Sequence, residues 1–295
     1  MTTNKIIPIL LMVFLTVAVF GQAKRKVPPG FKKKAREQQN SFLDKQWWIG
    51  LTLGPNLTKA VPDSRYSVLV PTDYDIALAD KAYDGFNQLG SQATLEITFN
   101  YKGFGFSFQP TYRLSRFSYE SEFLWENPEN AQETLQLNYK SKQSVDYADL
   151  PLIVKYEFTS NRLKPFIQAG IFYSVLVNAS KTVERSGIDN GSGGTNPFTD
   201  PEVTVGAKDL FHKGYWGIIS GAGVNYSLGN VRLVLDASYR IGMSNITNAE
   251  NRFSNDRLAG IGDVFDDMKI DNIVISAGVL FPMRFLSTSF KSSDR

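Results

Sequence analysis

Apolar and polar residues alternate with a period of two along most of the chain beyond residue 46. In DLPLIVKYEF, Leu150, Leu152 and Val154 share one face, while Asp149 and Lys155 share the other. Strict alternation predicts a strand with one apolar and one polar face. Eight such runs predict the strands Trp47–Asn56, Ser91–Tyr101, Phe104–Leu114, Ala148–Phe158, Phe166–Val177, Tyr215–Ser227, Val231–Met243 and Asn272–Phe281.

The connections between these predicted strands alternate in length. An even strand number with strictly alternating connections is typical of an outer-membrane barrel. A soluble sandwich or a lipocalin-like barrel also fits the alternation, but neither has a reason to separate its loops by length. We therefore predict an all-β fold, an eight-stranded antiparallel transmembrane β-barrel with short periplasmic turns and long extracellular loops. The short turns are Lys102–Gly103, Thr159–Leu163 and Leu228–Asn230, and the long loops are Leu57–Gly90, Phe117–Ser144, Lys181–Gly214 and Ser244–Asp267.

The polar face of the predicted strands lines the lumen of this barrel. A charge without a partner is costly in a dry lumen, so we expect basic and acidic residues of different strands to pair across it. Eight strands leave an interior barely wide enough for their own side chains, which predicts a plugged lumen, with a narrow pore as the alternative. The predicted lumen charge network is Glu96, Arg113, Asp149, Lys155, Glu157, Arg232, Asp236 and Arg240, with Arg232, Asp236 and Arg240 expected opposite Glu96, Asp149 or Glu157.

Glycines and aromatic residues fall on opposite faces of the predicted strands. Small residues on the polar face suit a crowded lumen. Aromatic residues near strand ends on the apolar face are typical of the interface girdles of membrane barrels, although aromatics favour strands in any case. The glycines are Gly105, Gly170, Gly217, Gly221 and Gly223, and the aromatics are Trp47, Tyr101, Phe104, Tyr156, Phe158, Trp216, Tyr226, Tyr239 and Phe281.

The N-terminus has the pattern of a secretory signal peptide, predicted over residues 1–21. A single early charge, Lys5, precedes the apolar run Ile6–Phe20, and small residues precede Gln22. The run is short for a transmembrane helix, so an uncleaved anchor is the weaker alternative. The chain has no cysteine, which excludes a lipoprotein anchor, disulfides and thiolate chemistry.

A basic arm follows, predicted over residues 22–46 on the periplasmic side. It holds eight basic and two acidic residues, whereas the chain from Trp47 onward is mildly acidic. The arm could contact an anionic polymer, lipid headgroups or an acidic protein face, or it could be a solvated linker. The barrel is predicted over residues 47–286 and a tail over 287–295. The predicted partner-binding residues of the arm are Lys24, Arg25, Lys26, Lys32, Lys33, Lys34 and Arg36.

Three segments carry a resemblance to a known family: YADLPLIVKYEF, KPFIQAGIFYSVLVNA and GAGVNYSLGNVRLVLDASYRIGMSNI. They resemble the outer-membrane β-barrel domain of PorT-like proteins in Bacteroidetes, and WWIGLTLGPNLT is similar to its first strand. The resemblance spans roughly Trp47 to Leu286 and implies an OmpA-like eight-stranded barrel. Some family members are required for type IX secretion and gliding motility, so it also implies a possible place among the accessories of that machinery.

Candidate chemistry in the predicted loops is sparse. His212 is the only histidine, and Asp209 lies three residues before it. A barrel enzyme that modifies outer-leaflet lipid would need a nucleophile or an activated water beside such a pair, but no nucleophile motif accompanies it. The carboxylates Asp263, Asp266, Asp267 and Asp271 lack the spacing of a calcium loop and are expected to form a solvated acidic rim. We predict no catalytic, cofactor-binding or metal site.

These patterns predict a protein of the cell outer membrane, exported by its signal peptide, with a plugged lumen. Its function is expected at its rims, in binding other envelope proteins, and the family resemblance points to secretion or gliding machinery. The alternatives are a lipid-modifying enzyme that uses His212, or a narrow pore. Outer-membrane lipid and periplasmic or outer-membrane proteins are the expected partners, and nucleic acid is not expected for an exported chain.

Overall fold

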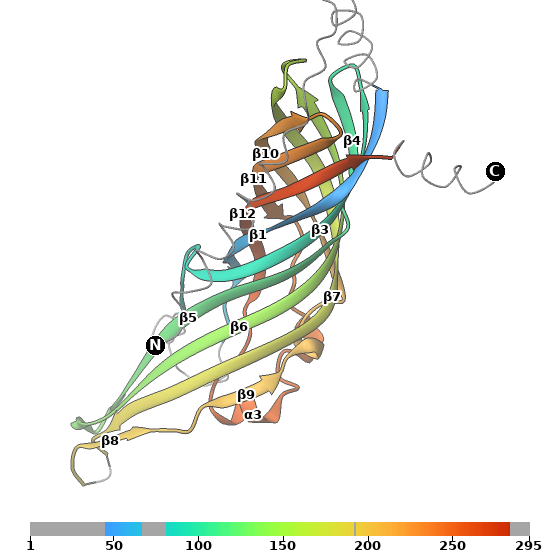
Figure 1. Cartoon of the computed structure of the whole chain (residues 1–295). Coiled ribbons are helices and arrows are strands. Elements are labelled where there is room, and N and C mark those ends of the chain that lie inside the picture. Colours follow the sequence, from blue (N-terminus) through green and yellow to red (C-terminus); the bar gives the residue numbers. More distant parts are fainter. Residues whose placement is uncertain (1–44, 67–80, 192, 284–295) are drawn as a thin grey trace, which may run out of the picture. The chain divides into compact units, whose positions relative to one another are not determined.

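The computed structural model describes residues 45–66, 81–191 and 193–283, which belong to one compact unit, Leu43–Arg295. The predicted signal peptide, nearly all of the predicted arm and the predicted tail lie outside the described residues. Strands make up most of the described chain (Figure 1). None of its helices is long and apolar enough to cross a membrane.

Twelve strands and three short helices follow one another along the described chain. The strands are β1 Lys45–Ser64, β2 Lys81–Tyr83, β3 Gln88–Tyr101, β4 Phe104–Phe108, β5 Thr111–Asn127, β6 Asn130–Glu157, β7 Leu163–Asp189, β8 Asn196–Thr199, β9 Val203–Gly206, β10 Gly214–Leu228, β11 Val231–Gly242 and β12 Asp267–Pro282. The helices are η2 Lys208–Leu210, η3 Ala249–Asn251 and α3 Asp256–Gly260.

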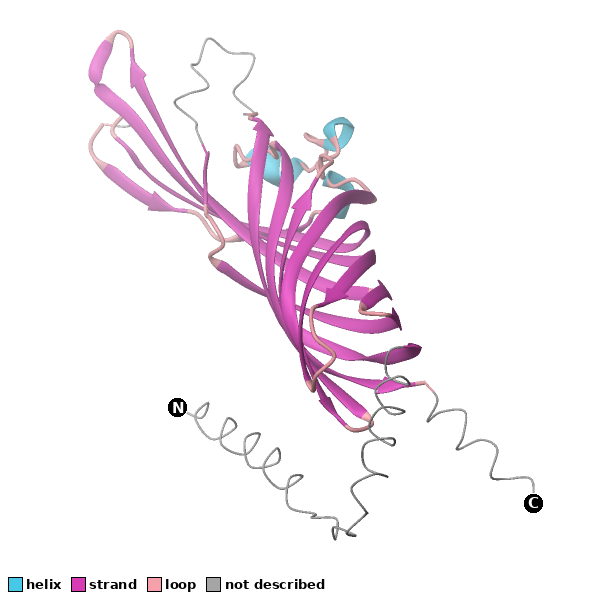
Figure 2. Ribbon diagram, turned by 90° about the horizontal axis from the view of Figure 1, so that it is seen from above, coloured by secondary structure: helices cyan, strands magenta, loops and turns pink. Residues whose placement is uncertain are grey.

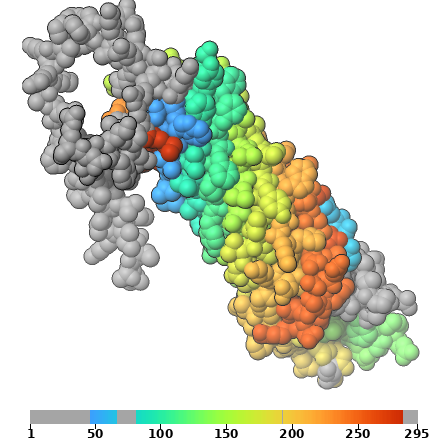
Figure 3. Space-filling view, turned by 90° about the vertical axis from the view of Figure 1, so that its right-hand side faces the viewer, coloured from blue at the N-terminus to red at the C-terminus, as the bar shows by residue number. Residues whose placement is uncertain are grey.

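The strands close into an antiparallel barrel. β1 pairs with β12 on one side and with β3 on the other, and the chain then meanders through β6, β7, β10 and β11. β4 and β5 together form one strand of the barrel wall, because both pair with β6 in a single register. The register is interrupted at Pro110, which has no N–H to donate. Counted in this way, eight wall strands surround the lumen, as predicted. Figure 2 shows the same barrel from above. In Figure 3 the colours pass around the wall in sequence order, as expected for a meander.

The barrel is polar inside and apolar outside, which confirms the predicted orientation. Leu152 on β6 and Ile171 on β7 are each 57% exposed on the outer face, whereas Asp149 and Arg113 are fully buried in the lumen. Along β1 the outward residues are apolar from Trp47 to Leu57. That length suits a membrane-spanning strand, which needs about 9–11 residues. All nine aromatics of the predicted girdles are exposed on the outer face.

Three of the predicted long loops are wrong in part, because their strands continue; within Leu57–Gly90, β1 runs on to Ser64. Phe117–Ser144 is a β-hairpin in which only Pro128 and Glu129 separate β5 from β6, and β7 runs to Asp189. We call the parts Phe117–Asn127, Asn130–Ser144 and Lys181–Asp189, with β8 and β9, the β extension (Figure 1). Its outward residues change from apolar to polar, so the alternation that marks a lipid-facing strand is absent although the strands go on. Among these outward residues are Glu120, Glu122, Lys140 and Lys142.

Two lumen glycines make room for aromatic rings on the neighbouring strand. Gly223 of β10 pairs with Phe166 of β7, and Gly217 pairs with Phe172. A Cβ atom at either glycine would lie 2.5 Å from the Cζ atom of the opposing ring. The rings therefore lie across the β10 backbone, which explains why the small residues are on the lumen face.

Candidate functional site: the closed lumen and the extracellular cap

The periplasmic end of the lumen is closed by a group centred on Glu157. Its carboxylate lies 2.9 Å from Nη1 of Arg232 and 3.3 Å from Nζ of Lys164. The side-chain amide of Asn225 donates a further hydrogen bond to it. The guanidinium of Arg232 in turn stacks over the buried ring of Trp48, at 4.2 Å from its centroid. The side chains of this group come from β1, β6, β7, β10 and β11 and meet across the lumen.

Two further layers of ion pairs lie above this group. Nζ of Lys155 lies 2.6 Å from Glu96. Higher up, Asp149 lies between two guanidiniums, 2.7 Å from Nε of Arg113 and 2.6 Å from Nη1 of Arg240. Ser174 donates a further hydrogen bond to Asp149, and Arg113 donates one to the Tyr215 hydroxyl. Each charged residue of these two layers is therefore held by at least one opposite charge from another strand.

The structure places all eight residues of the predicted lumen charge network on the inner face. Seven of them form the ion pairs above, with Arg232 opposite Glu157 and Arg240 opposite Asp149. Asp236 has no ion pair within the described chain and accepts a hydrogen bond from Ser276. Lys164 was not predicted in this network, although its position two residues before Phe166 gives it the right face. The predicted arm residues Lys24, Arg25, Lys26, Lys32, Lys33, Lys34 and Arg36 lie outside the described residues.

An apolar cap covers the extracellular end of the lumen. η2 and the segment 244–266 fold against the β extension, with which they share one apolar core. The rings of Phe211 and Phe265 pack edge to face at 5.1 Å, and both are buried. They contact a core cluster that includes Phe117, Val145, Tyr147, Val183, Leu210, Ile246, Leu258, Met268 and Ile270.

Two carboxylates fasten this cap to the barrel wall. Asp266 lies 2.7 Å from Nζ of Lys81 on β2, and Asp263 lies 2.6 Å from Nζ of Lys181 on β7. The hydroxyl of Tyr119 on β5 donates a hydrogen bond to Asp263. We call these five residues, with Tyr83, whose hydroxyl donates to Asp266, the clasp.

The clasp corrects the prediction of a solvated acidic rim. Asp263 and Asp266 are buried, and Asp267 is paired with Arg252 at 2.6 Å. Asp271 accepts a hydrogen bond from Tyr239. The carboxylates lie close together in sequence, but their cationic partners come from distant strands, so spacing alone gave no sign of the pairing.

Burial changes the ionisation of the clasp, which lies above the membrane-spanning part of the strands. It lowers the pKa of Lys181 to about 8, an effect that the charge of Asp263 only partly opposes. Burial also raises the pKa of Tyr119 well above its ordinary value, and the nearby Asp263 raises it further. The tyrosines therefore stay protonated donors, and Lys181 is the group whose charge changes first as the pH rises.

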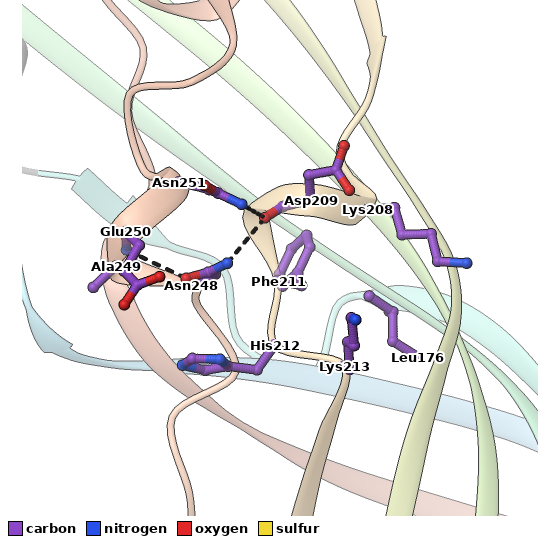
Figure 4. Close-up of a pocket in the computed structure, with 10 residues that line it drawn as sticks. All are labelled: Leu176, Lys208, Asp209, Phe211, His212, Lys213, Asn248, Ala249, Glu250 and Asn251. Atoms are coloured by element: carbon purple, nitrogen blue, oxygen red, sulfur yellow. Dashed lines mark hydrogen bonds between the residues drawn. The ribbon is translucent and has the colours of Figure 1, made fainter.

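His212 lies in a pocket of about 570 Å³ beside the cap, which we call the His212 pocket (Figure 4). The backbone carbonyl of Asp209 accepts hydrogen bonds from the side chains of Asn248 and Asn251, which fix η2 against η3. The Asp209 carboxylate points away from His212 in this view. None of the described lining residues is a serine, threonine or tyrosine. They are Leu176, Lys208, Asp209, Phe211, His212, Lys213, Asn248, Ala249, Glu250 and Asn251.

No metal-ligand cluster of three or more His, Cys, Asp or Glu side chains occurs within the described ranges. The two carboxylates of the clasp are each paired with a lysine.

Several solved structures and one sequence family resemble this chain. No curated protein matches the chain. Among solved structures, Neisserial surface protein A is 14% identical, with 80% of this chain and 96% of that chain covered and a TM-score of 0.30. OprG from Pseudomonas aeruginosa is 10% identical, with 81% and 95% covered and a TM-score of 0.35.

A sequence model of one family matches residues 32–248, which is more than half of the chain. Its description is that of an outer membrane protein beta-barrel domain. The matched residues include seven of the eight wall strands described above, all but β12. The chain therefore belongs to the outer membrane protein beta-barrel domain family.

Proposed function

We propose that this protein is a non-conducting, non-enzymatic barrel of the cell outer membrane, exported by its signal peptide, that works by binding other envelope proteins. The observation that carries the proposal is the β extension. Its strands continue beyond the apolar belt as a hairpin whose outer face is polar and whose side chains near the turn are partly or fully exposed. A barrel that only anchored itself in lipid would have no use for so long an extension.

The closed lumen supports the non-conducting part of the proposal. Three layers of ion pairs and the apolar cap occupy the path through the barrel. An ion that crossed it would have to displace buried guanidinium–carboxylate pairs, and breaking such a pair costs about 3–5 kcal/mol.

The His212 pocket supports the non-enzymatic part. Its histidine has no carboxylate hydrogen-bonded to the imidazole in the described structure, and no hydroxyl nucleophile lines the pocket. A His212→Ala variant should therefore leave lipid A and phospholipid composition of the cells unchanged in mass spectrometry. A lost lipid modification would favour the enzyme instead.

The resemblance to PorT-like proteins supports a more specific partner class, the type IX secretion or gliding machinery. Deletion of the gene should then remove secreted cargo from the culture supernatant or stop gliding, and the wild-type gene should restore it. Normal secretion and motility in the deletion strain would leave the barrel with partners of another class.

The β extension can be tested by shortening it. Phe123 pairs with Leu137 in the hairpin, so replacing residues 123–137 by Asn-Gly would leave the Glu122–Asn138 pair next to a new tight turn. We expect the barrel to fold, seen as a heat-modifiable band, but to lose proteins that crosslink to the wild type in cells.

A second deletion, of Lys24 to Lys34, tests the basic arm separately. Envelope proteins lost only with this deletion would bind on the periplasmic side, and those lost only with the shortened hairpin would bind outside. Unchanged crosslinking with both variants would refute the proposal.

A further inference from the structure

The His212 pocket lies where the barrel wall opens. The β7–β10 ladder ends at the pair Val175–Gly214, and β7 pairs with β9 only from Ser180 onward. Between these ladders the segment 207–213 leaves the wall and forms η2. Single hydrogen bonds, Leu176 N to Lys213 O and Ala207 N to Ala179 O, hold its two ends. The pocket is therefore a notch in the wall and not a part of the lumen.

This notch lies at the upper edge of the apolar belt. Tyr173 and Val175 are exposed on the outer face of β7 just before the ladder ends, and Trp216 is exposed on β10 three residues after Lys213. Aromatic residues of this kind mark the level of the lipid headgroups. A ligand in the pocket would thus be at headgroup height in the outer leaflet.

The lining of the pocket combines free cations with an apolar floor. Lys208 and Lys213 are exposed and make no ion pair or hydrogen bond through their ammonium groups within the described chain. Figure 4 shows both on the Leu176 side of the pocket, with His212 and Glu250 on the opposite side. Leu176 is buried, as is the adjoining Phe211. Two ammonium groups thus lie on one side of the pocket, where Asp209 also carries an exposed carboxylate, and Glu250 supplies an acceptor on the other.

We infer that the His212 pocket binds the phosphorylated sugar headgroup of an outer-leaflet glycolipid. The ammonium groups of Lys208 and Lys213 contact the phosphate, since charge-assisted hydrogen bonds to phosphate are strong. Glu250 on the opposite side accepts hydrogen bonds from sugar hydroxyls. The acyl chains run down the exposed apolar side chains of Tyr173, Val175 and Trp216. The site is independent of the protein partners proposed above.

The test is native mass spectrometry of the purified full-length protein with bisphosphorylated lipid A. Each lysine near a membrane surface contributes about 1 kcal/mol toward an anionic headgroup, so Lys208→Ala/Lys213→Ala should weaken binding roughly thirtyfold. Dephosphorylated lipid A should lose a similar factor with the wild type. Lys208→Gln/Lys213→Gln serves if the alanine variant loses its heat-modifiable band.

The matched control is Lys140→Ala/Lys142→Ala, which removes two exposed lysines from the outer face of β6. Their partners Glu120 and Glu184 are exposed too, so little stability is at stake. This variant should bind lipid A as the wild type does. Equal loss in the control, full binding by the pocket variants, or equal binding of dephosphorylated lipid would each overturn the inference. Displacement of lipid A by inorganic phosphate at equal concentration would assign the site to free phosphate and overturn the lipid assignment.

Discussion

Asp149 illustrates how single residues make the lumen of this barrel possible. Removing a carboxylate from water costs several kcal/mol, and only close opposite charges and hydrogen bonds offset that cost. Arg113, Arg240 and Ser174 supply them from three different strands. Where the lumen holds no charge, steric fit determines which side chain is tolerated. Gly223, for example, leaves room for the ring of Phe166.

Gly223→Val should therefore destabilise the folded barrel by at least about 2 kcal/mol, because overpacking forces the ring or the backbone to move. The added Cβ would lie 2.5 Å from Phe166 and 2.6 Å from the carbonyl oxygen of Leu235. Urea unfolding in lipid vesicles measures the loss. Gly206→Val is the control, because a Cβ there meets nothing within 4 Å. Equal stability of the two variants would contradict this account of the lumen glycines.

At the scale of elements, several strands extend beyond the membrane-spanning part of the barrel. β5, β6 and β7 carry apolar residues outward only as far as the extracellular girdle, and beyond it they form the β extension. The extension then serves as the wall against which the cap folds. Lys181 on β7 and Tyr119 on β5 hold Asp263, so the clasp joins two strands of that wall to a loop.

The clasp predicts an unusual pH dependence. The folded pKa of Lys181, about 8, lies below its ordinary value of 10.5, so the unfolded chain binds more protons between these two values. Stability should then rise by about 2 kcal/mol from pH 7 to pH 9.5. Above pH 10 it should fall, because Tyr119 ionises only when unfolded. The midpoint temperature of thermal unfolding reports both changes.

Lys181→Met is the control for this prediction. Without the ammonium group the rise between pH 8 and pH 9.5 should vanish, while the decline above pH 10 should stay. A steady decline from pH 7 upward in the wild type would show that Lys181 remains charged in the folded cap.

The whole described unit is a barrel closed along its length. Charged layers fill the membrane-spanning part, and the cap with its clasp fills the extracellular end. The proposed binding functions therefore lie at the surfaces: the β extension, the rims and the His212 pocket.

Closure predicts that the purified protein forms no channel in planar lipid bilayers. Asp263→Asn/Asp266→Asn should loosen the cap but produce no conductance, because the ion pairs below it remain. A porin in the same apparatus is the positive control. Reproducible single-channel steps from the wild type, absent after His-tag purification of an unrelated barrel, would refute the closed lumen.

Much of the fold and part of the site could be predicted from particular residues. Alternation separated Asp149 and Lys155 from Leu152 and Ile171, and the alternating loop lengths with the placement of glycines and aromatics assigned the first pair to the lumen and the second to the outside. The hairpin Phe117–Ser144 was missed because polar outward residues such as Glu120 remove the contrast with lipid. Lys81 and Lys181 were missed because nothing local relates them to Asp266 and Asp263.

The sequence by itself determined the strand number, their antiparallel meander and the face that each side chain takes. These properties follow from period-two alternation and turn length, which are local and which lipid makes strict. Only the tertiary structure decided where the strands end outside the membrane, which charges meet, and that a cap closes the lumen. Those outcomes depend on contacts between residues as distant in sequence as Lys81 and Asp266. A local pattern of apolar and polar residues does not show which distant residues meet.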